Sequence, residues 1–253
     1  MPIAVSAREA KENRVGNTFP EVIAKPFYRS LYFGSPPARG GSADENKKAM
    51  PQAYLIEQPA NSEVAAHFHD TNQFQVFVHG KGAFGKKPFD GVMVHYAKAH
   101  TTYGPISAGD DGAHYMTLRN NWDSGAKLMP ANRDKLRKIK RLHRVAEEVP
   151  VLDAAALKFV AVETADLIPL EEDGLGVRQF NIGPGHECAI TFETNGAGGY
   201  AYVVGGSVRY DGDEYETKSL IYRAHDDAPL AVKGGTEGAS VLLLQFPPEP
   251  DGE

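Results

Sequence analysis

The sequence has 253 residues, of which 42% are hydrophobic and 24% are charged, enough to form one large core or two of ordinary size. A net charge of −6 gives the whole chain no tendency to bind nucleic acid or anionic membranes, and no apolar run approaches the roughly 18 residues that cross a bilayer. The single cysteine, Cys188, excludes an internal disulfide and a cysteine zinc cluster. This cysteine usage favours a reducing, cytoplasmic setting, and the first residues lack a signal-peptide core.

The first half of the chain reads as an arm followed by strands. We expect residues 1–45 to form an N-terminal arm that ends in the flexible, turn-rich stretch Gly34–Gly41. Residues 46–125 then contain short β-rich runs separated by turns, and no helix is expected among them. The predicted strands are Ala53–Glu57, Val64–His69, Gln73–His79, Val92–Tyr96 and Tyr115–Arg119.

Residues 126–150 differ in character and are expected to link two domains. Asn132 is an acceptable helix N-cap, and Leu136, Ile139 and Leu142 follow at three-residue spacing, so the pattern predicts a helix over 132–145. Its other faces are rich in Lys and Arg. We interpret it as a solvated basic linker helix, with contact to nucleic acid or an acidic partner as the alternative.

After Pro150 the strand pattern resumes, and several short segments resemble segments of the first half. The predicted strands are Phe159–Val162, Val177–Ile182, Ala189–Glu193, Tyr200–Val204, Val208–Tyr210, Leu220–Tyr222 and Val241–Phe246. The matching segments are Gln75–Gly82 with Tyr200–Ser207, Val94–Tyr96 with Leu220–Tyr222, and Met116–Arg119 with Leu242–Gln245. This indicates an internal duplication. We therefore predict an all-β protein of two antiparallel barrels or jelly rolls, over residues 46–125 and 151–253.

Two histidines in the first half stand on one predicted strand. In a strand, residues two apart point to the same side, so His67 and His69 face one way and Phe68 the other. The next strand alternates in the same manner, with Gln73 and Gln75 on a partly polar face and an apolar face opposite. A barrel interior lined by polar ligands accounts for both patterns.

The spacing of these residues resembles the first motif of the cupin superfamily. That motif reads H-x-H, three or four residues, E, six residues and G, and His67, His69, Gln73 and Gly80 fit it with Gln in place of Glu. The resemblance implies a bicupin, that is, two tandem cupin-like barrels of the double-stranded β-helix or jelly-roll type.

A second cupin motif places a histidine about ten residues after a Gly-Asp turn. His100 stands ten residues after Asp90, although the usual Pro and Gly of that motif are absent. By resemblance, one divalent transition metal would be held inside the first barrel by four residues. They are His67, His69, Gln73 and His100.

The chemistry of these ligands points to the same kind of centre. Imidazole nitrogens suit iron, manganese, nickel and zinc, and we prefer iron. Because Gln73 is neutral where glutamate would carry a charge, the metal keeps its full positive charge and should favour an anionic or chelating substrate. The alternative is that His67 and His69 are packed barrel residues in a protein that has lost its metal.

Two further residues are candidates for catalysis. Tyr103 follows His100 closely, and its phenol could donate a hydrogen bond to a substrate oxygen; the alternative is an aromatic that packs in a turn. Arg119 ends a predicted strand and could bind a carboxylate, or form a surface ion pair instead.

The second half carries no comparable ligands. Counted back from Gly206, the two histidine positions fall on Phe192 and Thr194, or on Glu193 and Asn195 if the spacer is one residue shorter, and the glutamate position falls on Gly198 or Gly199. We therefore expect the second barrel to be degenerate, with a structural role and no metal.

These observations favour a metal-dependent enzyme. Within that class we prefer an oxygenase that acts on a small anionic or chelating organic molecule. A non-catalytic protein that binds or senses a small molecule is the alternative, as is a metal-dependent isomerase or lyase. We expect a small-molecule substrate, no nucleic acid or membrane partner, and a homodimer. The sequence identifies neither the substrate nor the metal.

Overall fold

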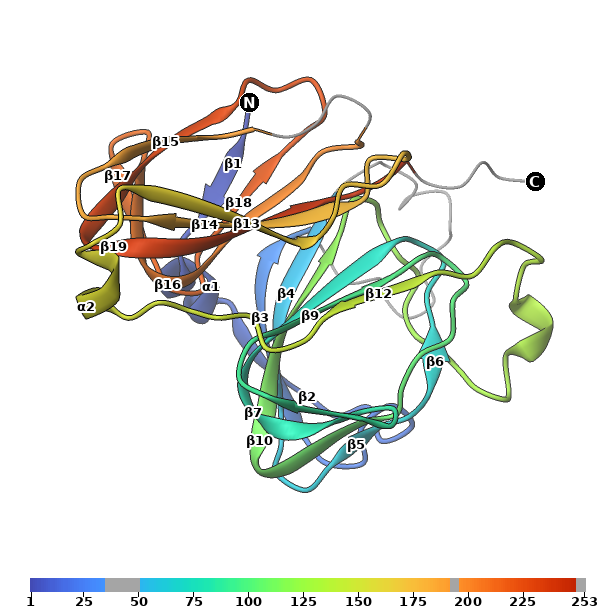
Figure 1. Ribbon diagram of the computed structural model, residues 1–253. Helices are drawn as coiled ribbons and strands as arrows, with labels where there is room; N and C mark the ends of the chain where they lie inside the picture. Colours follow the sequence, from blue (N-terminus) through green and yellow to red (C-terminus); the bar gives the residue numbers. More distant parts are fainter. Residues whose placement is uncertain (35–50, 192–195, 249–253) are drawn as a thin grey trace. The chain divides into compact units, whose positions relative to one another are not determined.

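The computed structural model describes residues 1–34, 51–191 and 196–248 (Figure 1). The chain divides into two compact units. The N-terminal unit comprises Glu12–Val149, and the C-terminal unit comprises Met1–Lys11 together with Pro150–Pro248. Within the described part of the chain, no helix has the length and apolar character needed to cross a membrane.

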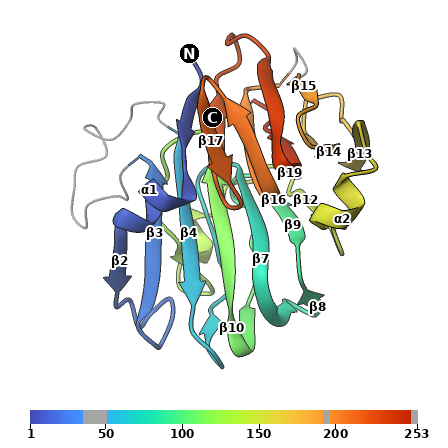
Figure 2. The ribbon, with the colours of Figure 1, turned by 90° about the vertical axis from the view of Figure 1, so that its left-hand side faces the viewer.

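The N-terminal unit is built on one large antiparallel sheet. Its strand order is β12-β9-β7-β10-β4-β3-β2, and Figure 2 shows β2, β3, β4, β10, β7 and β9 side by side in that order. Two short strands pair at its margins, β5 with β10 and β8 with β7, while β6 and β11 form a separate pair. The strands are β2 (Arg14–Asn17), β3 (Phe27–Phe33), β4 (Gln52–Gln58), β5 (Glu63–Val64), β6 (His67–Phe68), β7 (Gln73–Phe84), β8 (Lys87–Asp90), β9 (Met93–Ala97), β10 (Ile106–Arg119), β11 (Lys127–Leu128) and β12 (His143–Ala146).

Alternation along β7 separates a polar interior from an apolar layer. Phe74 and Val76 are completely buried on one face, and Gln73 and Gln75 are buried on the other. Beyond Gln75 on the same face, Phe77 begins a hydrophobic core. Four of the five strands predicted for residues 52–119 are present, although β7 and β10 are longer than expected, and no helix interrupts them. The fifth, Val64–His69, is divided into β5 and β6, which pair with different strands, and His69 follows the end of β6.

The C-terminal unit repeats this plan. Its sheet order is β1-β18-β16-β19-β14-β13, with β15 paired to β19 and β17 paired to β16. The elements are β1 (Ile3–Val5), α1 (Ala7–Glu12), α2 (Ala154–Leu157), β13 (Val162–Ile168), β14 (Gly176–Ile182), β15 (Glu187–Ile190), β16 (Gly199–Tyr210), β17 (Asp213–Glu216), β18 (Leu220–Arg223) and β19 (Leu230–Gln245). Strand β13 begins where the predicted Phe159–Val162 ends, because Phe159 is exposed beyond α2.

Strand pairing supports the duplication but shifts one of its matches by one residue. Gln75 on β7 lies opposite Thr117, and Ala201 on β16 lies opposite Leu243. Thr117 and Leu243 hold the same position in the two matching segments Met116–Arg119 and Leu242–Gln245. The counterpart of Gln75 is therefore Ala201 and not Tyr200. A shift of one residue exchanges the two faces of a strand.

Two glycines explain this register. Gly80 and Gly206 both have positive φ angles, of 85° and 65°, which favour glycine. In each, an added Cβ would lie within 2.1 Å of a facing glycine carbonyl, so neither tolerates a side chain. The sequence alignment of the two segments places Gly80 opposite Gly205, because Gly205 and Gly206 are adjacent and either could match.

The predicted linker helix over 132–145 is wrong. Only a three-residue 3-10 turn, Arg133–Lys135, forms there, and Leu136 is already extended at φ −70° and ψ 122°. Residues 127–144 carry eight Lys or Arg and a single acidic residue, Asp134, so a helix would crowd like charges with few opposite partners. The end of this segment instead forms β12 along the edge of β9.

The expected N-terminal arm is divided between the two units. Strand β1 pairs with β18 in the C-terminal unit, whereas β2 and β3 extend the N-terminal sheet beside β4. Phe27, Ser30, Tyr32 and Phe33 are buried along β3, which pairs with β4 through a register shift between Leu31 and Phe33. The linker residues up to Val149 also belong to the N-terminal unit. Most of the predicted flexible stretch, from residue 35 onward, lies outside the described residues.

Candidate functional site

A cavity of about 490 Å³ lies inside the N-terminal unit. Its walls combine apolar side chains with a cluster of polar ones, as in small-molecule sites. The apolar side includes Phe19, Val22, Phe27, Ile56 and Trp122, and the polar side includes His67, His69, Gln73, Gln75, Tyr103, Arg119 and Asp123. Five of the six predicted site residues are thus brought together around one cavity.

Backbone pairing fixes two of these residues beside each other. His67 and Tyr103 form an isolated antiparallel bridge, with both N–H groups donating to the opposite carbonyl at 3.0 Å. The far side of β6 pairs with β11, where Leu128 lies opposite His67. The backbone pairing holds the two residues side by side, and the His67 and Tyr103 rings lie 4.5 Å apart between centroids.

The hydrogen bonds of both histidines fix their tautomers. The Nδ1 of His67 lies 2.7 Å from the carbonyl oxygen of Ala65, and the Nδ1 of His69 lies 2.7 Å from Oδ2 of Asp123. A carbonyl and a carboxylate only accept, so Nδ1 donates in each ring and Nε2 keeps its lone pair. Metal-binding histidines in proteins are commonly held in this way by their other nitrogen.

Both rings are neutral at physiological pH. Burial, together with the neighbouring His69, lowers the pKa of His67 to about 3. Burial also lowers the pKa of His69, although the adjacent Asp123 carboxylate opposes the shift. Two neutral imidazoles with unprotonated Nε2 atoms are the protonation state that a metal ion requires.

Gln73, Tyr103 and Arg119 form a second network along the cavity wall. Nη2 of Arg119 donates to Oε1 of Gln73 at 2.5 Å, and Nε2 of Gln73 donates to the Tyr103 hydroxyl at 2.6 Å. The other terminal nitrogen of Arg119 donates to the Tyr54 hydroxyl at 2.9 Å. Burial raises the pKa of Tyr103, so its phenol stays protonated and can donate a hydrogen bond to a ligand.

A buried carboxylate balances the buried guanidinium. Asp123 Oδ2 lies 3.9 Å from Nη2 of Arg119, and both side chains are at most 3% exposed. Burial alone would raise the pKa of Asp123, but His69 and Arg119 lower it overall, so Asp123 remains charged. Asp123 therefore orients His69 and also neutralises part of the charge of Arg119.

The donor set fits a divalent metal in two respects. The ring centroids of His67 and His69 are 5.1 Å apart, and two imidazoles that share one ion at about 2.1 Å from each nitrogen have centroids roughly 5 Å apart. Gln73 Oε1 has a second lone pair, and Tyr103 supplies a neutral oxygen. Within the described residues, no three His, Cys, Asp or Glu side chains converge, so any ion would depend on two imidazoles and weaker oxygen donors.

One contact opposes metal binding. Nη2 of Arg119 lies 3.3 Å from Nε2 of His69, where a metal would approach. A permanent positive charge at this position weakens the binding of a cation and strengthens that of an anion. A metal ion in this site would therefore be accompanied by an anionic ligand.

His100 does not join the group. Its residue has a positive φ of 58°, its N–H donates to the His69 carbonyl, and its ring lies 5.6 Å from that of Phe68. Phe68 faces the opposite side of the strand from His67 and His69. The left-handed backbone at His100 thus turns its side chain away from the cavity, and Tyr103 stands beside His67 instead.

The sequence did not single out several residues of the site. Asp123 contacts His69 from 54 residues away in the chain, and no spacing in the sequence connects them. Gln75 had a detectable signal, because it shares a strand face with Gln73. Behind Gln75, Nδ1 of the completely buried His95 lies 3.2 Å from its Oε1, and Nε2 of His95 lies 3.0 Å from His143.

Comparisons with known proteins identify the fold. The sequence matches no protein-family model and no curated protein. Among solved structures, the chain is similar to a dioxygenase candidate from Nostoc punctiforme, with a TM-score of 0.66 and 12% identity over 97% of this chain and 82% of that one. Oxalate decarboxylase from Lactobacillus farciminis, in complex with formate, gives 0.59 and 10% over 99% and 88%.

A bacterial pirin from Escherichia coli, in complex with nickel(II), is also similar, with a TM-score of 0.56 and 13% identity over 98% of this chain and 100% of that one. At identities of 10–13% these similarities show the fold. The chain therefore has the mostly β cupin fold that its first motif predicted.

Proposed function

We propose that this protein is a metal-dependent enzyme of the cupin type, and specifically an oxygenase that acts on a small organic anion. The observation that carries the proposal is the pair of buried, neutral imidazoles whose Nδ1 atoms are both occupied by acceptors. Their Nε2 atoms are then unprotonated, and both histidines line a cavity large enough for a small molecule. A metal bound there would have to displace Nη2 of Arg119 from Nε2 of His69.

His67 and His69 would hold the metal, with Gln73 and Tyr103 as neutral oxygen donors. A bound transition metal would supply Lewis-acid or redox chemistry and open coordination positions for small ligands. We prefer iron, and manganese, nickel and zinc suit the same donors. Two of the similar structures, a dioxygenase candidate and an oxalate decarboxylase, are consistent with small-molecule chemistry on this fold.

The other residues of the cavity favour an anionic substrate with an apolar body. Arg119 provides a buried positive charge for a carboxylate or phenolate oxygen, and the Tyr103 hydroxyl can donate a hydrogen bond to a second oxygen. Phe19, Phe27 and Trp122 would pack against the body of the molecule and exclude water. Asp123 would keep His69 oriented throughout.

Oxygen consumption tests this proposal. Protein purified without chelator and loaded with ferrous iron would be mixed with a panel of catechols, hydroxybenzoates and diketones. We expect metal-dependent oxygen uptake with at least one of them, lost in His67→Ala and retained in His186→Ala, whose histidine is exposed in the C-terminal unit. No uptake across the panel, or equal uptake in both variants, would exclude this oxygenase centre.

A second candidate is a protein that binds a small anion without a metal. The 2.5 Å hydrogen bond from Arg119 to Gln73, and the contact of Arg119 with His69, favour it, because they occupy atoms that a metal would use. In that case benzoate would bind the metal-free protein, Arg119→Gln would abolish binding, and added metal would leave the affinity unchanged.

A further inference from the structure

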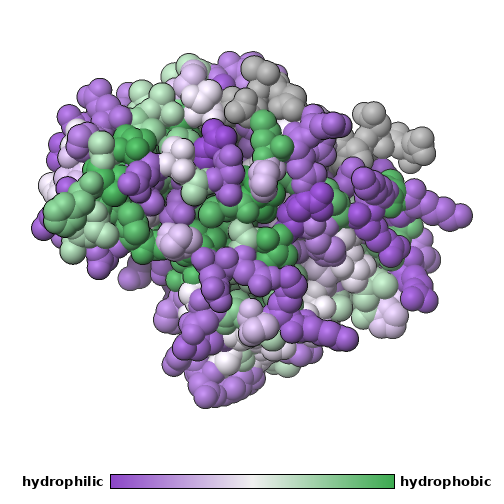
Figure 3. Space-filling model, in the orientation of Figure 1, coloured by the Kyte–Doolittle hydropathy of each residue, from purple (hydrophilic) through white to green (hydrophobic). Residues whose placement is uncertain are grey.

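The segment between β11 and β12 concentrates positive charge on an acidic chain. Residues 127–144 hold eight Lys or Arg and one acidic residue, although the whole chain has a net charge of −6. In Figure 3, hydrophilic side chains gather at the right of the view, where Figure 1 shows this segment. An excess of one sign in a small region creates a local field that attracts counter-charged molecules.

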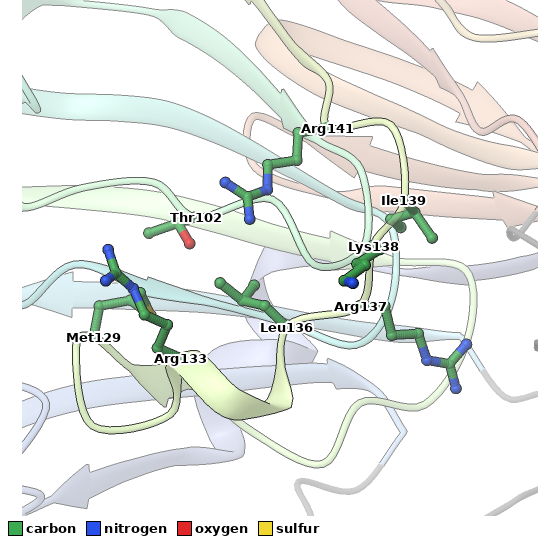
Figure 4. Close-up of a pocket in the computed structure, with 8 residues that line it drawn as sticks. All are labelled: Thr102, Met129, Arg133, Leu136, Arg137, Lys138, Ile139 and Arg141. Carbon is green, nitrogen blue, oxygen red and sulfur yellow. The ribbon is translucent and has the colours of Figure 1, made fainter.

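This segment folds around a pocket of about 960 Å³. Figure 4 shows the guanidinium groups of Arg133 and Arg141 extending towards Thr102, with Leu136 between them, while Arg137 points away. The pocket shares no lining residue with the cavity around His67. The residues that line it are Thr102, Met129, Arg133, Leu136, Arg137, Lys138, Ile139 and Arg141.

The cations of the pocket have no partner in the described part of the chain. No ion pair or side-chain hydrogen bond is formed there by Arg133, Arg137, Lys138 or Arg141. No acidic residue lines the pocket. Arg133 and Arg141, whose guanidinium groups extend towards the same residue, therefore repel each other, and an anion placed between them would offset that repulsion.

Two further features of the lining indicate the chemistry of a ligand. The Oγ1 atom of Thr102 is buried and has no hydrogen-bond partner among the described residues, and it lies on the side towards Arg133 and Arg141. Met129, Leu136 and Ile139 are partly buried and supply apolar surface between the charges. The pocket thus offers charge, a hydroxyl and an apolar floor together.

We propose that this pocket binds a small organic anion, a phosphate or carboxylate carried on an apolar body, at a site separate from the His67 cavity. Arg133 and Arg141 would hold the anionic group by charge-assisted hydrogen bonds, and Leu136 and Ile139 would contact the body. A small molecule is favoured over nucleic acid, because no aromatic side chain that could stack on a base lines the pocket.

The position of the pocket connects it to the cavity through the backbone. Thr102 precedes Tyr103, and Met129 follows β11, whose Leu128 pairs with His67. The N–H of Met129 also donates to the carbonyl of Ala66. An anion that ordered this segment would therefore act on the strands that carry His67 and Tyr103, whichever function the cavity has.

The test is a titration of the full-length protein with phenyl phosphate, followed by backbone ¹H–¹⁵N NMR, with inorganic phosphate as a second probe. We expect saturable shifts at Thr102 and through residues 129–141, and weaker binding of inorganic phosphate, which lacks the apolar body. The double variant Arg133→Gln/Arg141→Gln should weaken phenyl phosphate binding by at least about tenfold, because it removes two charge-assisted contacts.

The matched control is Lys135→Gln/Lys140→Gln, which removes the same charge from exposed positions of the same segment outside the pocket. It should change the affinity by less than about twofold, as expected for loss of screened surface charge alone. Equal weakening in the two double variants, or shifts confined to the residues around His67, would overturn the proposal. So would a single-stranded oligonucleotide that binds this segment with the same variant dependence when phenyl phosphate does not.

Discussion

The two units share a strand plan but differ in what fills the interior. In the N-terminal unit, Gln75 lies opposite both Thr117 and His95 on the neighbouring strands. Three apolar residues occupy the same pairing positions in the C-terminal unit, where Ala201 lies opposite Leu243 and Ile221. The fold itself therefore requires no polar interior, and the polar cluster of the N-terminal unit is a separate feature of that copy.

The contrast extends to the end of the last long strand. Arg119 pairs with Gln73 in the N-terminal unit, and Gln245 pairs with Gly199 in the C-terminal unit. A buried charge is thus replaced by a neutral amide. Because buried charges are expensive unless they are paired, the network around Arg119 indicates a function that the C-terminal unit does not share.

The largest expected effect is on stability at Arg119. Arg119→Met leaves the buried Asp123 with one partner fewer, so unfolding in urea should show a loss of about 3–5 kcal/mol. Gln245→Met at the counterpart position removes a neutral hydrogen bond to the Gly174 carbonyl and should cost about 1–3 kcal/mol. Equal losses would show that the charge of Arg119 is not what distinguishes the two interiors.

Exchanging residues between the units should give unequal results. Leu243→Thr removes apolar contacts from a packed core and buries a hydroxyl, so it should destabilise the protein by about 2–5 kcal/mol. Thr117→Leu places a larger side chain beside the 490 Å³ cavity, where there is room, and should change stability by less than about 1.5 kcal/mol. Both are measured by chemical denaturation, and a severe loss from Thr117→Leu would mean that the cavity is filled in solution.

A smaller effect is expected in the pH dependence of stability. Burial lowers the pKa of His95 well below its ordinary value, so the folded protein keeps this ring neutral while the unfolded chain binds a proton below about pH 6.5. Stability from His95 is therefore complete above pH 6.5 and falls, as the pH decreases, by up to about 1.4 kcal/mol per pH unit.

His95→Ile, which introduces the residue of the C-terminal copy, should remove that contribution to the slope. The measurement is urea unfolding of chelator-treated protein between about pH 7 and pH 5, across the unfolded-state pKa of histidine. An unchanged slope would contradict a neutral, buried His95.

The sequence predicted the parts of the fold that depend on local alternation. The side-chain period along Gln73–His79 predicts the polar and apolar faces of β7, and the i, i+2 spacing of His67 and His69 predicts that both rings point to one side. Both histidines do line one cavity, although His69 lies just beyond the end of β6. The cupin motif added the expectation of a barrel interior. These features depend on residues that are close together in the chain, so a single sequence is sufficient to predict them.

Features set by distant parts of the chain were not predictable. Nothing near His69 identifies Asp123 as its partner, and nothing near His100 reveals a left-handed backbone that turns its ring away. The prediction of a helix after Asn132 was wrong for a related reason. Its apolar spacing was adequate, but the pairing of β12 with the edge of β9 is a tertiary interaction.

The most direct test of the central claim is a long-range ¹H–¹⁵N NMR spectrum of the histidine rings, recorded before and after addition of one equivalent of Zn²⁺. The account predicts that His67 and His69 are neutral, with the proton on Nδ1, and that Zn²⁺ shifts both Nε2 resonances while those of His186 and His225 in the C-terminal unit stay in place. Protons on Nε2 of either ring, or Nε2 resonances that do not respond to the metal, would contradict it.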